Sequence, residues 1–271
     1  MLKDFLKAFE DIMYFEKFAD SEGFLQPINP LIKLVSFTAI ILSSVTIRSI
    51  APLTIPLIAV ILLCRLSKIP LGYFVKRVTF FIPIFAGVIA SPLLFVTSGT
   101  SLAQIGSEPF VLHLTMEGFQ KAALFTFRIW ICVATLNLLI LTTKFSQILR
   151  AMNRLRVPKL FITMTATTYR FIFLFINEAY RMILAKESRT AKKESRLKSL
   201  RSLASMFATL FIRAYEKGER TYLAMLARGF NPGARSLNDN DLRIRDWLFL
   251  AASLVICMVT LSTDLLRLVG Q

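Results

Sequence analysis

Five apolar runs separated by more polar segments of different lengths divide the sequence, and they predict helices that cross a membrane. A helix rises about 1.5 Å per residue, so about 20 apolar residues cross the hydrocarbon core of a bilayer. We predict transmembrane helices over residues 31–47, 50–64, 78–96, 118–141 and 247–266. Prolines interrupt the second and third runs, and we expect Pro52 and Pro56 to kink the second helix. Residues 1–27 mix apolar and charged positions and predict an amphipathic helix at the membrane interface.

A sixth run, residues 160–177, has the length and apolar character of a span, but we reject it as one. Arg170 would lie near the bilayer centre, which costs about 2.5–3.5 kcal/mol on insertion scales. A span here would also place two strongly basic segments on opposite faces of the membrane. We therefore expect a long helix at the cytoplasmic surface.

Charge gives the orientation of the spans. The chain has 271 residues, 55% of them hydrophobic, and a formal net charge of +16. Residues 144–245 hold 21 Lys and Arg against seven Asp and Glu, whereas the loop at 97–117 holds no basic residue. The excess of basic residues in cytoplasmic loops places the N-terminus inside and the C-terminus outside. One basic block beside apolar spans fits a lipid bilayer or an acidic partner, and no nucleic-acid-binding motif supports a nucleic-acid partner.

These patterns predict three parts of the chain. Residues 1–143 hold the interfacial segment and the first four spans, 144–245 form a cytoplasmic helical domain, and 246–271 form the last span. Within the basic block, apolar residues at helical spacing predict three helices. Pro158 ends the first helix and begins the second, because proline fits the start of a helix but not its interior. The second and third helices are formed by the apolar runs 160–185 and 203–227.

One short pattern occurs twice in this block, at an offset of 39 residues. Arg181 aligns with Arg220, and Ser188-Arg189-Thr190 aligns with Ala227-Arg228-Gly229. Each copy closes an apolar run with an Arg between two small residues. Arg is suited to planar, bidentate recognition of carboxylates, so two matched tips indicate docking into two equivalent pockets. The alternative is that each Arg only complements the dipole at a helix C-terminus.

The sequence lacks the motifs of several function classes. It contains no phosphate-binding loop for ATP, no zinc-protease motif and no nucleophile elbow. The three cysteines lie in apolar segments without ligand spacing, and His113 is the single histidine. No acidic residue lies at mid-span, which is unlike an ion-coupled carrier. We predict a non-catalytic chain that binds no metal and no cofactor and acts through its cytoplasmic surface.

Several segments resemble a known family. They are Leu141-Thr142-Thr143-Lys144-Phe145, Leu149, Leu155-Arg156-Val157-Pro158, Tyr169-Arg170, Glu178, Phe211-Ile212-Arg213-Ala214-Tyr215-Glu216 and Ala224-Met225-Leu226-Ala227-Arg228-Gly229-Phe230. They resemble the T component (EcfT) of energy-coupling-factor ABC transporters, and most resemble the CbiQ branch, which serves cobalt importers and has a nickel counterpart. The start of the first span, from Asn29-Pro30 to Leu34, is similar to the family's opening motif.

The resemblance implies an all-α membrane protein with about five transmembrane helices and a cytoplasmic coupling domain of long crossing helices. It implies that the two Arg tips insert into two CbiO-like ABC ATPase subunits, which bind ATP and magnesium. It adds a CbiM-like substrate-binding membrane subunit, with or without a small CbiN-like subunit, in the inner membrane of a prokaryote. It gives structural roles in the coupling domain to Pro158, Tyr169, Arg170, Glu178, Arg181 and Arg220.

Two alternatives stay open at this point. The same architecture could serve vitamin-binding subunits in place of a metal-binding one. A membrane enzyme that acts on lipid phosphates at the cytoplasmic leaflet would need a nucleophile or an acid–base pair near the basic block, and the sequence contains none.

Overall fold

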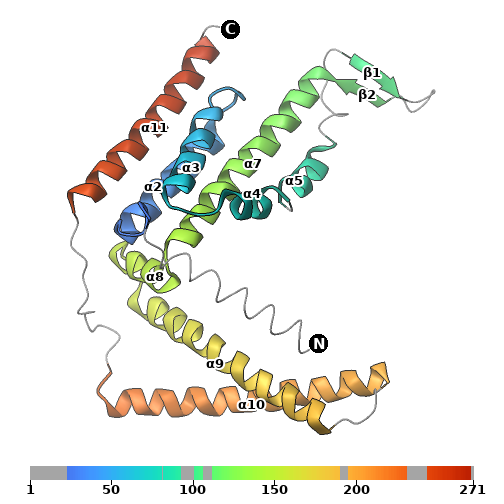
Figure 1. Cartoon of the computed structure of the whole chain (residues 1–271), viewed down its shortest axis with the longest axis vertical. Coiled ribbons are helices and arrows are strands. Elements are labelled where there is room, and N and C mark those ends of the chain that lie inside the picture. Colours follow the sequence, from blue (N-terminus) through green and yellow to red (C-terminus); the bar gives the residue numbers. More distant parts are fainter. Residues whose placement is uncertain are drawn as a thin grey trace. The chain divides into compact units, whose positions relative to one another are not determined.

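The computed structural model describes residues 23–80, 82–92, 101–105, 112–189, 195–230 and 243–269. In chain order its elements are α2 (Pro30–Thr46), α3 (Thr54–Leu66), α4 (Leu71–Phe80), α5 (Ile82–Ala90), β1 (Ser101–Ile105), β2 (Leu112–Thr115), α7 (Met116–Thr142), α8 (Phe145–Arg154), α9 (Lys159–Arg189), α10 (Arg196–Ala227) and α11 (Ile244–Val269) (Figure 1). The chain divides into a larger unit, Phe15–Ile148 with Asn240–Gln271, and a smaller one, Met1–Tyr14 with Leu149–Asp239.

Helix α2 is the centre of the larger unit and packs against α7 and α11. Phe37 is fully buried, and its ring meets that of Phe249 on α11 edge to face, with 6.1 Å between centroids. Ser43 and Ser44 are also buried, and each hydroxyl donates to the carbonyl of Ile40 one turn earlier. Small residues of this kind let helix backbones approach closely within a membrane bundle.

Two buried carboxylates attach α11 to the two ends of α2. At the start of both helices, Asp246 accepts hydrogen bonds from the backbone N–H of Asn29 (2.9 Å) and of Arg243 (2.8 Å). Near the other end, Asp264 accepts from the N–H groups of Arg48 and Ser49 and from the Ser49 hydroxyl. The carboxylates lie eighteen residues apart, or about 27 Å along a helix. The two helices therefore run parallel.

Two cations attach α7 to the same two ends of α2. Lys33 is fully buried, and its ammonium donates to the carbonyls of Thr142 (3.0 Å) and Gln26 (3.3 Å) and to the Thr143 hydroxyl (3.5 Å). A cation at the C-terminal carbonyls of α7 also opposes the negative end of that helix dipole. The Arg128 guanidinium, halfway along α7, donates to the carbonyl of Ile47 just after α2 ends. Helix α7 is therefore antiparallel to α2.

The end of α3 meets the segment before α2 through a close backbone approach at Gly23. A Cβ atom added there would lie 2.6 Å from the Ser67 carbonyl oxygen. The neighbouring Gln26 exchanges hydrogen bonds with Ser67 through its amide. Only a residue without a side chain fits this approach.

The all-α membrane fold class is confirmed, with an antiparallel hairpin of β1 and β2 as the one element outside it in the described chain. Three described helices, α7, α9 and α11, are long and apolar enough to cross a membrane, while α2 and α3 are shorter. Because α9 passes this test, its assignment to the cytoplasmic surface stays a prediction. The predicted interfacial helix at 1–27 lies almost wholly outside the described residues.

The structure corrects two details of the predicted spans. The expected kink in the second span is wrong, because α3 begins only at Thr54, with Pro52 in the preceding turn and Pro56 in the first turn. A proline in the first turn removes no helical hydrogen bond. The third span is not one helix from 78 to 96, since α5 ends at Ala90.

We expect Asp246→Ala to destabilise the larger unit by about 3 kcal/mol, because it removes two hydrogen bonds to a buried charge and the negative charge near Lys33. Thermal unfolding of the purified protein in detergent should show a lower Tm. Glu219→Ala removes an exposed carboxylate on α10 and should leave the Tm unchanged. Equal Tm values for Asp246→Ala and the wild-type protein would contradict the role of this carboxylate.

Candidate functional site

A backbone reversal, and not proline alone, separates α8 from α9. Arg156 adopts a left-handed conformation with φ 64°. Its N–H donates to the Asn153 carbonyl, and the Val157 N–H donates to the Met152 carbonyl, which is the Schellman arrangement that closes a helix. Pro158 follows, and its carbonyl accepts the first hydrogen bonds of α9, from Phe161 and Ile162. The predicted break at Pro158 is present.

Helices α9 and α10 form the body of the smaller unit, where they cross each other (Figure 1). On one side of the crossing, apolar side chains from both helices line a groove of about 380 Å³. The lining residues are Ala179, Met182 and Ile183 of α9 with Leu203, Met206, Phe207 and Leu210 of α10. Apolar side chains of both helices thus lie together at this groove, where the helices contact each other.

Charged side chains gather on the other side of the crossing. Glu178 of α9 forms an ion pair with Arg213 of α10. Arg220 lies 3.8 Å from Glu216, one turn away on the same helix. The candidate residues Glu178 and Arg220 thus border one charged surface with Arg213. Arg213 was absent from the predicted site set, although an acidic residue on a basic, apolar helix is a signal that a cation lies opposite.

The two Arg tips lie at helix ends, as the repeat predicted. Arg189 is the last residue of α9, and Arg228 is the C-cap of α10. Both side chains are exposed. Gly229 has φ 66°, and the N–H groups of Gly229 and Phe230 close the helix in another Schellman arrangement. Thr190, the third residue of the first tip, lies outside the described residues.

The tips extend along different arms of the crossing. Arg189 lies eleven residues beyond Glu178, about 16 Å along α9, and Arg228 lies fifteen residues beyond Arg213, about 22 Å along α10. Because the helices cross, these arms point in different directions (Figure 1). The structure therefore does not bring the two tips together. Each tip is exposed separately, at the end of its own helix.

The remaining candidates, Tyr169, Arg170 and Arg181, line neither the charged surface nor the apolar groove. Tyr169 and Arg170 occupy the first half of α9, where the Tyr169 ring packs edge to face on Phe173, with 5.1 Å between centroids. Arg170 and Arg181 are exposed. Among the described residues, no three His, Cys, Asp or Glu side chains gather as potential metal ligands.

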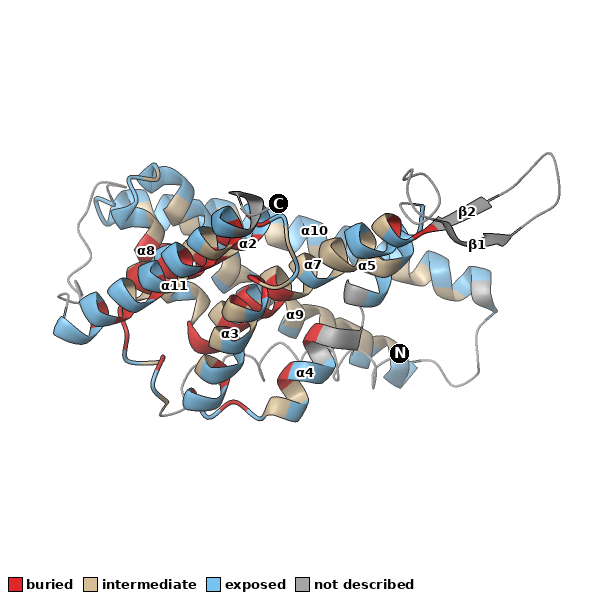
Figure 2. Cartoon of the chain, turned by 90° about the horizontal axis from the view of Figure 1, so that it is seen from above, coloured by how far each residue is buried: buried red, intermediate tan, exposed pale blue. Residues whose placement is uncertain are grey.

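The smaller unit exposes large apolar side chains. No residue of α9 is buried, and the red positions of Figure 2 gather on helices of the larger unit and on α8, while α10 is exposed along most of its length. The exposed set includes Phe161, Phe207, Phe211, Tyr215, Tyr222 and Leu226. An apolar surface of this extent is typical of a partner-binding or membrane-facing region.

Comparison with known proteins identifies similar sequences. Residues 21–238 match the family CbiQ, described as "Cobalt transport protein". The chain is 34% identical to the uncharacterized protein MJ1571 of Methanocaldococcus jannaschii over 96% of this chain and 89% of that protein. A protein of Methanocorpusculum labreanum, named as a fused cobalt transport protein CbiMQ, is 30% identical over 65% of this chain and 29% of its own length. The energy-coupling factor transporter transmembrane protein EcfT of Listeria innocua is 24% identical over 92% and 96%.

We expect Glu178→Arg and Arg213→Glu each to weaken the α9–α10 crossing, because each places like charges together. The combined swap should restore the wild-type interaction. The pair is partly exposed, so the coupling energy should be about 0.5–1 kcal/mol. A double-mutant cycle on thermal unfolding in detergent measures it, and additive effects of the two changes would contradict the pairing.

Proposed function

The chain belongs to the CbiQ family of cobalt transport proteins, and we propose that it is the coupling subunit of an energy-coupling-factor importer for cobalt or nickel ions. In this role it is a multi-pass membrane protein without catalytic activity of its own. Two CbiO-like ATPase subunits bind and hydrolyse ATP with magnesium. A CbiM-like membrane subunit, with or without a small CbiN-like subunit, binds the metal ion.

The observation that carries this proposal is the pair of exposed Arg tips at the ends of two long helices. Each tip offers one guanidinium at the end of a helix, which fits a groove with an acidic residue. Two tips on separate arms suit two ATPase subunits. Ser188 and Ala227 precede the arginines, and their small side chains leave room for close approach.

The apolar groove and the exposed aromatic residues beside it support a second docking surface. Phe207 lines the groove, and Phe211 and Tyr215 follow it at helical spacing on α10, all of them exposed. Large apolar and aromatic anchors dominate the binding energy of protein interfaces. We assign this surface to the substrate-binding membrane subunit. The name of the fused CbiMQ relative joins a CbiM part with a CbiQ part, and this favours a CbiM-like partner over a vitamin-binding one.

The crossing links the two surfaces mechanically. When ATP draws the ATPase pair together, each tip moves with its own ATPase. Helices of about 30 residues transmit this motion as stiff rods, and the Glu178–Arg213 pair and the apolar contact act as the pivot. A change in the angle between α9 and α10 then reshapes the surface that holds the substrate-binding subunit. The chain couples ATP hydrolysis to transport in this way without performing chemistry itself.

We place this protein in the inner membrane of a prokaryote with its N-terminus inside and its C-terminus outside. The parallel course of α2 and α11 supports this arrangement, because both helices then run outward. In a background without Cys64, Cys132 and Cys257, Thr100→Cys and Gln271→Cys should react with an impermeant maleimide on intact cells. Ser195→Cys should react only after permeabilisation. Labelling of Ser195→Cys in intact cells would refute the orientation.

We expect Arg189→Ala or Arg228→Ala to weaken ATPase binding by roughly 30-fold or more, since a stranded partner charge costs on the order of 2–5 kcal/mol. The double variant should abolish uptake of radioactive cobalt and capture of the ATPases by the tagged membrane protein. Arg201→Ala, an exposed arginine in the first half of α10, is the matched control and should behave as wild type. Normal capture of the ATPases and normal cobalt uptake by the double variant would contradict docking through the tips. Each arginine would then only complement the dipole of its helix.

A further inference from the structure

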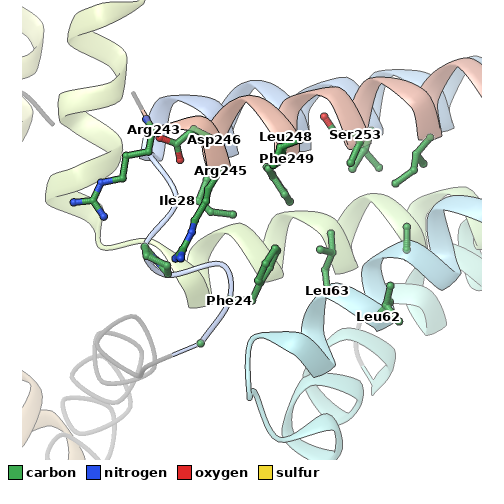
Figure 3. Close-up of a pocket in the computed structure, with 16 residues that line it drawn as sticks. Phe24, Ile28, Leu62, Leu63, Arg243, Arg245, Asp246, Leu248, Phe249 and Ser253 are labelled. Atoms are coloured by element: carbon green, nitrogen blue, oxygen red, sulfur yellow. Dashed lines mark hydrogen bonds between the residues drawn. The ribbon is translucent and has the colours of Figure 1, made fainter. Parts of the chain in front are cut away.

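A groove in the larger unit lies between α3 and α11. Its volume is about 790 Å³, and its walls are formed mainly by apolar side chains, among them Leu62 and Leu63 of α3 and Leu248 and Phe249 of α11 (Figure 3). Phe24 and Ile28, from the segment before α2, close one end. Leu62 and Leu248 are themselves largely exposed, so the groove opens on a face that contacts acyl chains in a membrane.

Two cations lie at the closed end of this groove, at the level where α2 and α11 begin. Arg243 and Arg245 both line it, and the Arg245 side chain extends toward Phe24 (Figure 3). Neither guanidinium has a hydrogen-bond or ion-pair partner among the described residues, and both side chains are exposed. The groove end is therefore positively charged and unneutralised by the described chain.

The other polar groups of the groove are already occupied. Both carboxylate oxygens of Asp246 accept backbone hydrogen bonds, and its charge is offset by Lys33 close by. The Ser253 hydroxyl donates to the carbonyl of Leu250. Among the described residues that line the groove, this leaves the two guanidinium groups and the apolar walls to bind a ligand.

We propose that this groove binds an anionic phospholipid, with its phosphate at Arg243 and Arg245 and an acyl chain between α3 and α11. Length favours a lipid over a transmembrane helix of a partner. From Arg245 to Ile256, the farthest lining residue of α11, is about 16 Å, or half of a hydrocarbon core of about 30 Å. This is the depth of one leaflet, whereas a partner helix would need the full thickness. The cation pair and the adjoining apolar walls match the two chemical parts of the lipid.

The experiment uses the 271-residue chain in nanodiscs of phosphatidylcholine with a small fraction of phosphatidylglycerol that carries a photoreactive acyl chain. Cross-linked peptides should map to 59–63 and 248–256. The same label on phosphatidylcholine should react several-fold less at these positions. An equal yield from both lipids would overturn the selectivity for anionic lipid, and a label spread evenly over the exposed apolar faces would overturn the site.

Two variants test the parts of the groove separately. Arg243→Gln with Arg245→Gln should reduce phosphatidylglycerol labelling by at least tenfold, since each basic side chain at an anionic surface contributes a factor of about five. Arg65→Gln with Lys76→Gln removes two exposed cations that do not line the groove and should change labelling little. Ala252→Trp should fill the groove and block labelling while the arginines remain. Wild-type labelling in either groove variant, or cross-links at the groove to another protein chain in place of lipid, would refute the proposal.

Discussion

Four charges, three of them buried and one partly buried, hold the transmembrane part of this chain together, and all of them act at the ends of α2. Asp246 and Lys33 lie at its start, and Asp264 and Arg128 at its end. In a bilayer the apolar side chains gain nothing by leaving lipid for a helix interface, so packing and hydrogen bonds must keep the helices in place. Backbone groups at helix ends are the natural partners of such charges, because there they lack helical partners. The arrangement fixes direction and register at once: α11 runs parallel to α2 and α7 antiparallel to it.

The smaller unit, in contrast, has few buried contacts between its helices. No residue of α9 is buried. Helices α9 and α10 contact each other through a partly exposed ion pair and beside an open apolar groove. A stable monomeric domain would cover its large apolar side chains, and these helices leave Phe207, Phe211 and Tyr215 open. This exposure is expected of a unit whose apolar side chains are covered by other chains or by lipid. The unit is also suited to movement, because few contacts must break for the crossing angle to change.

Much of the fold could be predicted from hydropathy and proline placement, because long apolar helices carry a strong signal. The helices at 118–141 and 247–266 and the break at Pro158 needed no structural information. The hairpin β1–β2 could not be predicted, since it depends on pairing between strands. For the site, the repeat located both Arg tips, whereas the pairing of Glu178 with Arg213 depends on the crossing and not on a local motif.

The two tips share a sequence pattern but differ in backbone, and this difference bears on how each can act. Arg228 is followed by Gly229, whose left-handed conformation turns the chain away and leaves the guanidinium at the extreme end of α10. Arg189 is still helical, and the hydroxyl of Ser188 beside it bonds back to the Leu184 carbonyl. In both places the negative end of the helix dipole favours the cation by about 0.3–1 kcal/mol. The dipole thus helps to hold each arginine at its helix end before any partner binds. A place at the helix end is therefore compatible with the docking role that we propose for each arginine.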